Sequence, residues 1–167
     1  MNAQFLDTEA AFALRAKQLV DRLYDQMADA LIERGLKIIS KTMGIVQLLY
    51  SEGAKSQAQI ADRLKYSPQL TAQRLAWLID NEFVVSQRDP SDARRRLVEL
   101  TAAGMAEGSK LQSFLPELIS AYDALFEEIG IDLDAAIQKA DGALEATPLK
   151  ERMASPSKLN RRTGGVM

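Results

Sequence analysis

Apolar residues recur at intervals of three and four positions in four stretches of the chain, which is the spacing of an amphipathic helix. The pattern predicts four helices, at residues 8–34, 37–52, 101–129 and 133–146. Helix-ending residues follow shortly after these stretches, namely Gly35, Gly53, Gly130 and Pro148. The sequence therefore predicts a mainly α protein.

The helices predicted near the two ends carry more apolar surface than a small core needs. The first, at residues 8–34, would be about 39 Å long at 1.5 Å per residue. In residues 111–129 the apolar positions follow the a and d spacing of a coiled coil, widened by neighbouring apolar residues. Both patterns favour contact with a partner helix, although a helix packed wholly within its own monomer would also explain the first. Pro116 should kink the later helix or split it near Phe114.

The helix predicted at residues 37–52 has a mostly apolar inner face. Its inward residues are expected to be Ile39, Met43, Val46, Leu49 and Tyr50. Gly44 lies inside this helix, where glycine costs about 1 kcal/mol relative to alanine. It marks either a close approach of another helix or a small loss of helix stability that the protein tolerates.

Residues 56–82 read as two short helices joined by a turn. Ser56 with Gln59 three residues later forms a capping box at the start of the first helix. Ser67 caps the second helix, and Pro68 stands at its first position, where the missing N–H costs nothing. We expect this second helix to run to about Glu82.

The second short helix has an apolar side and a side of small and amide-bearing residues. The residues expected to face inward are Thr71, Leu75, Leu78 and Ile79. The opposite side presents Gln69, Ala72, Gln73 and Ala76. A helix docked in a major groove suits such a face, because glutamine can pair bidentately with adenine and small residues allow close approach. An ordinary solvent-exposed helix face would have the same pattern of residues.

A β-hairpin with a charged turn is predicted directly after these helices. Residues 84–87 and 97–100 are short β-prone runs that flank a turn at residues 88–96, which carries four arginines. Asp89 and Asp92 are expected to pair with Arg88 and Arg94. This pairing would leave the remaining two arginines free to reach a minor groove or clamp phosphate.

Three of these features together resemble the multiple-antibiotic-resistance regulator (MarR) family of winged-helix transcription factors. They are the Ser67-Pro68 helix start, Arg88 with Asp92-Ala93-Arg94 in the wing, and the following Leu100-Thr101-x-x-Gly104. The resemblance implies a winged helix-turn-helix core at residues 37–104 within a single domain of residues 1–167. Residues 8–34 and 105–147 would be dimerisation helices, and residues 154–167 a flexible basic tail.

The resemblance also assigns roles to individual residues. The helix from Pro68 would be the recognition helix, and Asp92 and Arg94 would belong to the structural and DNA-contacting core of the wing. The family often has arginine or lysine where this chain has Gln73, so Arg74 either supplies a phosphate contact or covers a neighbouring helix with its stem. The expected DNA-binding residues are Ser67, Gln69, Thr71, Ala72, Gln73, Arg74, Arg88, Asp92, Arg94, Arg95 and Arg96. Met43, Gln47 and Trp77 are candidates for an effector crevice between the dimerisation and DNA-binding parts, with core packing as the alternative role of each.

Charge supports a nucleic-acid partner only in part. The chain has 167 residues, 47% of them hydrophobic, and a net charge of −2. Residues 55–101 hold eight Lys or Arg against six Asp or Glu, which leaves 13 of the 21 basic and 17 of the 23 acidic residues for the rest. The candidate DNA-facing segment is therefore the more basic part of the chain.

The absence of cysteine and histidine excludes several kinds of functional site. It excludes disulfides, thiol oxidation sensors and the usual zinc and haem ligands, so we expect no cofactor and no metal. There is no phosphate-binding loop or nucleophile motif, which argues against an enzyme. No apolar run is long enough to span a membrane, and no signal peptide is evident, so we expect a cytoplasmic protein.

Two functions remain. The first is a homodimeric repressor on a pseudo-palindromic operator in double-stranded DNA, released by a small organic effector. The second is a winged-helix protein-interaction module without DNA binding, which the acidic pI of about 5.3 favours.

Overall fold

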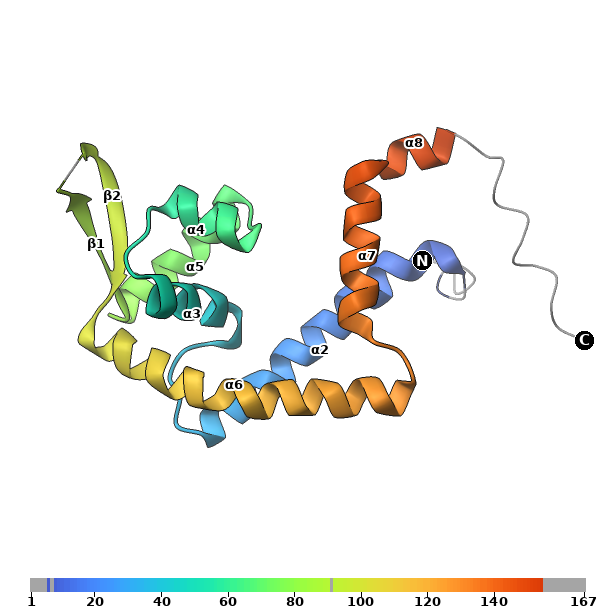
Figure 1. The fold of residues 1–167 in the computed structure, drawn as a ribbon, viewed down its shortest axis with the longest axis horizontal. Helices are drawn as coiled ribbons and strands as arrows, with labels where there is room; N and C mark the ends of the chain where they lie inside the picture. The colour runs from blue at the N-terminus through green and yellow to red at the C-terminus, as the bar shows by residue number, and fades with distance from the viewer. Residues whose placement is uncertain (1–5, 7, 91, 155–167) are drawn as a thin grey trace, which may run out of the picture. The chain divides into compact units, whose positions relative to one another are not determined.

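The computed structural model describes residues 6, 8–90 and 92–154, apart from the side chains of Ala93 and Arg94. Its helices and strands are the 3₁₀ helix η1 (Glu9–Ala11), α2 (Phe12–Glu33), the 3₁₀ helix η2 (Ser40–Thr42), α3 (Met43–Glu52), α4 (Gln57–Leu64), α5 (Pro68–Asp80), β1 (Val84–Asp89), β2 (Asp92–Leu100), α6 (Ala102–Ile129), α7 (Leu133–Ala146) and α8 (Leu149–Ala154) (Figure 1). The fold is a mainly helical winged helix-turn-helix with a two-stranded wing, as predicted. The chain divides into two compact units after Pro116.

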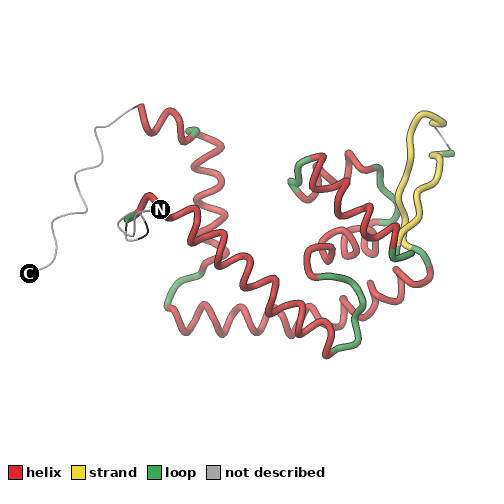
Figure 2. The backbone as a smooth tube through the Cα atoms, turned by 180° about the vertical axis from the view of Figure 1, so that it is seen from behind, coloured by secondary structure: helices red, strands yellow, loops and turns green. Residues whose placement is uncertain are grey.

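The core of the first unit is built from apolar side chains on every helix from α2 to α6. Its largest fully buried side chains are Leu31, Ile45, Val46, Ile60, Leu78 and Leu111, with the hydroxyl-bearing Thr42 and Thr71. Burying a side chain the size of leucine contributes about 1.5–3 kcal/mol. This core holds α3, α4 and α5 together beside the hairpin, which extends away from them (Figure 2).

The helix-turn-helix follows the local sequence signals closely. Both halves of the capping box between Ser56 and Gln59 are present at the start of α4. Lys65, in the left-handed region at φ 54°, ends that helix. The Ser67 hydroxyl then accepts a hydrogen bond from the Leu70 amide at 3.2 Å, and Pro68 begins α5. These predictions are confirmed, and α5 ends at Asp80, two residues before the predicted end.

The helix predicted at residues 37–52 begins later than its apolar pattern indicates. Residues before Ser40 are not helical, and α3 proper begins at Met43. The amides of Lys37 and Ile38 instead donate to Glu107 Oε2, at 2.6 and 3.3 Å. Ile39, expected to face inward, is 40% exposed because it lies in this extended segment.

Gly44 of α3 marks a close approach, which is one of the two interpretations of its sequence position. A Cβ at this position would lie 3.1 Å from the Tyr66 hydroxyl and 3.8 Å from the Leu64 side chain. The turn between α4 and α5 therefore packs directly against α3.

The hairpin is longer and its turn shorter than predicted. The strands pair antiparallel from Val84 opposite Leu100 to Asp89 opposite Asp92. The arginines predicted to lie in a charged turn belong to the strands instead. The register places Arg88 opposite Arg96, with an irregularity between Arg88 and Asp89.

Helix α6 continues through Pro116 and is not split there. Its N-terminal part packs very closely on neighbouring segments. A Cβ on Gly104 would lie 2.0 Å from the Phe83 carbonyl oxygen, and one on Gly108 would lie 2.4 Å from the Tyr50 ring. Only glycine fits at these two contacts, which explains the glycine of the Leu-Thr-x-x-Gly motif.

The second unit contains the remainder of α6 with α7 and α8. Asp132 caps α7 by accepting from the Ala135 amide at 2.8 Å, as predicted. Helix α8 was not predicted, and its Arg152 donates to the carbonyl oxygens of Ala143 and Thr147 at the end of α7. Among the described residues, none of those in α7 is buried. The predicted basic tail lies outside the described residues from 155 onward.

Candidate nucleic-acid interface

Helix α5 presents the predicted outer face to solvent. Gln69, Ala72, Gln73 and Ala76 are all exposed, whereas Thr71, Leu75 and Leu78 are buried on the opposite side. Ile79 was expected to be buried but is 42% exposed, because it lies at the edge of a hollow beside the wing. The outer face of α5 is thus a surface of small and uncharged residues.

Thr71 cannot contact DNA in this structure, which corrects its place among the expected DNA-binding residues. Its side chain has 0% exposure, and its hydroxyl donates to the Ser67 carbonyl oxygen at 3.0 Å. The helical pattern itself predicts Thr71 on the inner face, and the structure buries its side chain in the core. Ser67 is exposed at the N-terminus of α5, where backbone amides favour an anion.

Arg74 lies between the two faces and covers the neighbouring turn. Its guanidinium carbon is 4.2 Å from the centroid of the Tyr66 ring, a cation–π contact. Its Nε and Nη1 atoms are buried and lack a hydrogen-bond partner within the described residues. The alternative in which the Arg74 stem covers a neighbour is therefore the observed one. No pattern in the sequence predicted that the Arg74 guanidinium would stack on the Tyr66 ring.

The wing arginines are more engaged within the protein than predicted. Arg96 donates from Nε to the Ser86 hydroxyl at 3.0 Å and from Nη2 to the Ser86 carbonyl oxygen at 2.8 Å. Arg95 Nε lies 3.8 Å from the carboxylate of the buried Asp89. The prediction that Arg95 and Arg96 would be free is wrong, since the strands bring both beside partners on β1.

Two arginines nevertheless face each other across the wing. Arg88 and Arg96 are cross-strand partners, and both are exposed. Side chains in such positions share one face of the hairpin with Cβ atoms about 5 Å apart, and like charges there repel. An anion bound at this face would relieve the repulsion. Asp92 is exposed at the start of β2, and the Arg94 side chain lies outside the described part of the structure.

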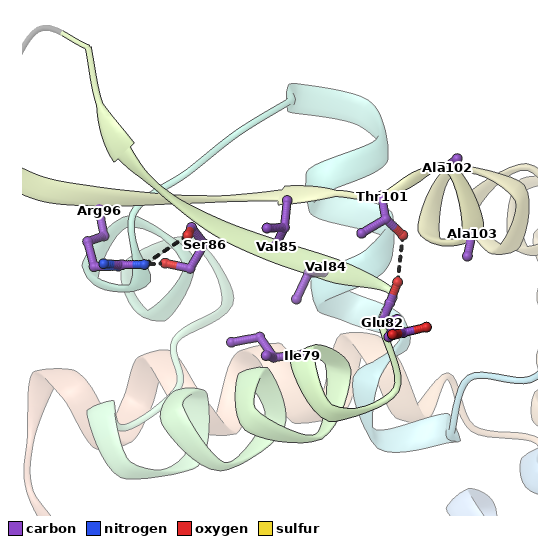
Figure 3. Close-up of a pocket in the computed structure, with 9 residues that line it drawn as sticks. All are labelled: Ile79, Glu82, Val84, Val85, Ser86, Arg96, Thr101, Ala102 and Ala103. Carbon is purple, nitrogen blue, oxygen red and sulfur yellow. Dashed lines mark hydrogen bonds between the residues drawn. The ribbon is translucent and has the colours of Figure 1, made fainter.

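The wing base, the end of α5 and the start of α6 surround a hollow of about 900 Å³ (Figure 3). The hydroxyl of Thr101 donates to the Glu82 carbonyl oxygen at 2.6 Å, and its amide donates to the Phe83 carbonyl oxygen at 3.0 Å. The residues that line the hollow are Ile79, Glu82, Val84, Val85, Ser86, Arg96, Thr101, Ala102 and Ala103. The threonine of the Leu-Thr-x-x-Gly motif thus ties α6 to the segment between α5 and the wing.

The three effector-crevice candidates are not brought together. Met43 is buried in the core, and Trp77 stacks on Phe83 with ring centroids 6.0 Å apart. Gln47 donates from Nε2 to Ser51 and to Gln112 Oε1. It lines a smaller hollow of about 380 Å³ with Gly44, Leu48, Ser51, Glu52, Arg63 and Leu64. Met43 and Trp77 are not among these lining residues, so the packing role fits both of them better.

Ionic contacts join α3 to α4 and α6 to the segment before α3. Arg63 of α4 bonds the carboxylate of Glu52 in α3, which lowers the pKa of Glu52. Glu107 of α6 is buried, and burial alone would raise its pKa. The hydrogen bonds from Lys110 and from the amides of Lys37 and Ile38 outweigh burial and lower the pKa of Glu107. Sequence periodicity does not mark Glu107, because the two amides lie about 70 residues away.

A capped helix-turn-helix followed by a two-stranded arginine-bearing hairpin defines the winged helix-turn-helix fold. Residues 42–95 match the sequence model of the MarR family. The match covers 54 of the 167 residues, so it assigns the winged helix-turn-helix segment, and not the whole chain, to the MarR family. No curated protein matches the chain.

Several solved structures share the fold. The S. aureus MepR–DNA complex is 18% identical with a TM-score of 0.66, and the match covers 83% of this chain and 99% of MepR. The Streptomyces coelicolor regulator PcaV, in complex with its natural ligand, is 20% identical with a TM-score of 0.62 and coverage of 86% and 99%. A MarR regulator from Methanosarcina mazei Go1 is 22% identical with a TM-score of 0.57 and coverage of 79% and 96%. Within the described residues, no helix has the length and apolar character needed to cross a membrane.

Proposed function

We propose that the protein is a homodimeric repressor that binds a pseudo-palindromic operator and is released by a small organic effector. The observation that carries the proposal is the outer face of α5, where the amides of Gln69 and Gln73 are exposed at the position of a recognition helix. The wing would lie beside it, with Arg88, Arg94 and Arg96 near phosphates or a minor groove.

Homodimer formation is supported by apolar residues that the single chain leaves uncovered. On α2, Phe12 is 69% exposed and Ile32 is 71% exposed. The second unit has its own exposed apolar residues, namely Ile119, Ile129, Ile131, Ile137, Leu144, Leu149 and Met153. Surfaces of this kind normally meet a partner. A second copy would also place two recognition helices one turn of DNA apart.

A small organic effector is supported by composition and by one relative. The chain has no cysteine and no histidine, so metal and thiol sensing lack their usual side chains. PcaV, which shares the fold, was solved with its natural ligand. An effector can alter DNA affinity only by binding one arrangement of the dimer better than another.

The first test measures binding of the whole chain to the DNA that flanks its own gene. Fluorescence anisotropy reports the binding at several salt concentrations. We expect tight binding at two chains per site, preference over an unrelated duplex, and an affinity that falls as salt rises. Arg94→Ala should weaken binding to every duplex and reduce the salt slope by about 0.9 for each phosphate that Arg94 neutralises. Absence of binding to either duplex would instead favour the protein-interaction module, and equal binding to both duplexes at all salt concentrations would indicate an operator elsewhere.

A further inference from the structure

The outer face of α5 offers hydrogen-bonding groups but no charge. Gln69 and Gln73 are exposed and one helical turn apart, and neither side-chain amide makes a hydrogen bond within the described part of the chain. The exposed Ala72 and Ala76 stand beside them at the same spacing. The two amides are therefore available to a partner, and the two alanines let that partner approach closely.

The one basic residue of α5 is turned away from this face. Arg74 stacks on Tyr66, and its Nε and Nη1 are buried. Bidentate contacts from arginine or lysine are the commonest way to read guanine in a major groove. The outer face of α5 lacks them, so its chemistry disfavours guanine readout.

The glutamine amides and alanine methyl groups on the outer face of α5 are suited to A·T pairs. A glutamine amide pairs bidentately with N6 and N7 of adenine, and an alanine methyl contacts the methyl group of thymine. One A·T pair presents both features in the major groove. Residues four apart on a helix are separated by about 6 Å, which is about two base-pair steps of 3.4 Å.

We propose that α5 reads a run of about four base pairs rich in A·T in each half-site. Gln69 and Gln73 contact adenines about two base pairs apart, and Ala72 and Ala76 pack on thymine methyl groups. This inference rests on the proposed function and names the DNA sequence class that the same surface recognises. It makes Gln73 a specificity-determining residue, because it lies at the centre of the face.

The experiment is selection of duplexes from a randomised library by the full-length protein, repeated with two variants. The parent should enrich an inverted repeat with A·T pairs at the centre of each half-site. Gln73→Arg should convert one of these pairs in each half-site to G·C, because arginine pairs bidentately with guanine. Gln138→Arg is the matched control, since Gln138 is also an exposed glutamine on a helix but lies on α7, where its side chain contacts Asp134 and not α5. It adds the same charge and should leave the selected sequence unchanged.

Modified bases then test the individual contacts on the selected duplex. In one duplex, the adenine that Gln73 contacts is replaced with 7-deazaadenine. In another, the thymine paired with that adenine is replaced with uracil. Each replacement should weaken binding of the parent. Replacing that pair with G·C should cost about fivefold to a hundredfold in affinity. The Gln73→Arg variant should tolerate the 7-deazaadenine without further loss.

The outcomes separate this inference from the function on which it rests. An enriched motif with G·C pairs at the half-site centre, unchanged by Gln73→Arg, would overturn the A·T readout and leave DNA binding intact. If no sequence is enriched at any salt concentration, both the readout and the proposed repressor function fail.

Discussion

Gly104 of α6 should not tolerate even a methyl group. An alanine Cβ would lie 2.0 Å from the Phe83 carbonyl oxygen and 3.0 Å from its carbonyl carbon. Carbon and oxygen normally approach no closer than about 3.3 Å. The start of α6 and the segment before β1 would thus have to separate by about 1.3 Å at this point, which also strains the hydrogen bond from the Thr101 amide to Phe83.

The magnitude follows from three opposing contributions. Overpacking costs about 1–3 kcal/mol, and a weakened hydrogen bond costs about 1 kcal/mol. Alanine recovers up to about 1 kcal/mol through its helix propensity. We therefore expect Gly104→Ala to lower the free energy of unfolding by about 2 kcal/mol, measured by urea denaturation with circular dichroism. DNA affinity should also fall, because Phe83 leads directly into the wing.

Gly142→Ala is the control, since Gly142 lies inside α7 with nothing within 4 Å of the added Cβ. This variant should be as stable as the parent or more stable by up to about 1 kcal/mol. If Gly104→Ala behaved like Gly142→Ala, the close approach between α6 and Phe83 would not exist in solution. The steric explanation for the glycine of the Leu-Thr-x-x-Gly motif would then be refuted.

Two further substitutions test buried polar groups. Glu107→Gln should destabilise the protein by about 2 kcal/mol at pH 7, because the amides of Lys37 and Ile38 no longer donate to a charged acceptor. The pKa of Glu107 is lowered in the folded state, so its contribution is present above about pH 4.3 and is lost as pH falls through the folded pKa. Urea denaturation across pH 3–7 should show parent and variant converging at the acid end, and a constant difference would contradict the ionised carboxylate. Arg74→Met should leave DNA affinity and its salt slope unchanged and should not lower stability, because the buried Nε and Nη1 atoms are unpaired. A steep loss of DNA affinity in anisotropy measurements would show that Arg74 contacts phosphate.

Features with local causes could be predicted from the sequence. The capping box at Ser56 and the Ser67-Pro68 start of α5 depend on residues within four positions of one another. The inner and outer faces of α5 follow from its period of 3.6 residues, and only Ile79 departs from the pattern. The fold followed from these segments and the wing motif together.

Features with distant or cross-strand causes could not be predicted. The start of α3 depends on Glu107, about 70 residues away, which takes the amides that a longer helix would have used. Arg96 pairs with Ser86 only because the strands extend further toward the turn than their apolar pattern indicates. Arg74 depends on where the turn places Tyr66. In each case a tertiary contact decides between conformations that are equally compatible with the local sequence.

The stacking of Arg74 on Tyr66 has a consequence for how quickly the proposed repressor would find its operator. Weak, sequence-independent attraction to phosphates lets a protein slide and hop along DNA between encounters with its target. A recognition helix whose cation is stacked on tyrosine, in a chain of net charge −2, contributes little to that attraction. The attraction to random DNA would then come mainly from the arginines of the wing. Substitutions in the wing would therefore slow the search for the operator more than substitutions in α5.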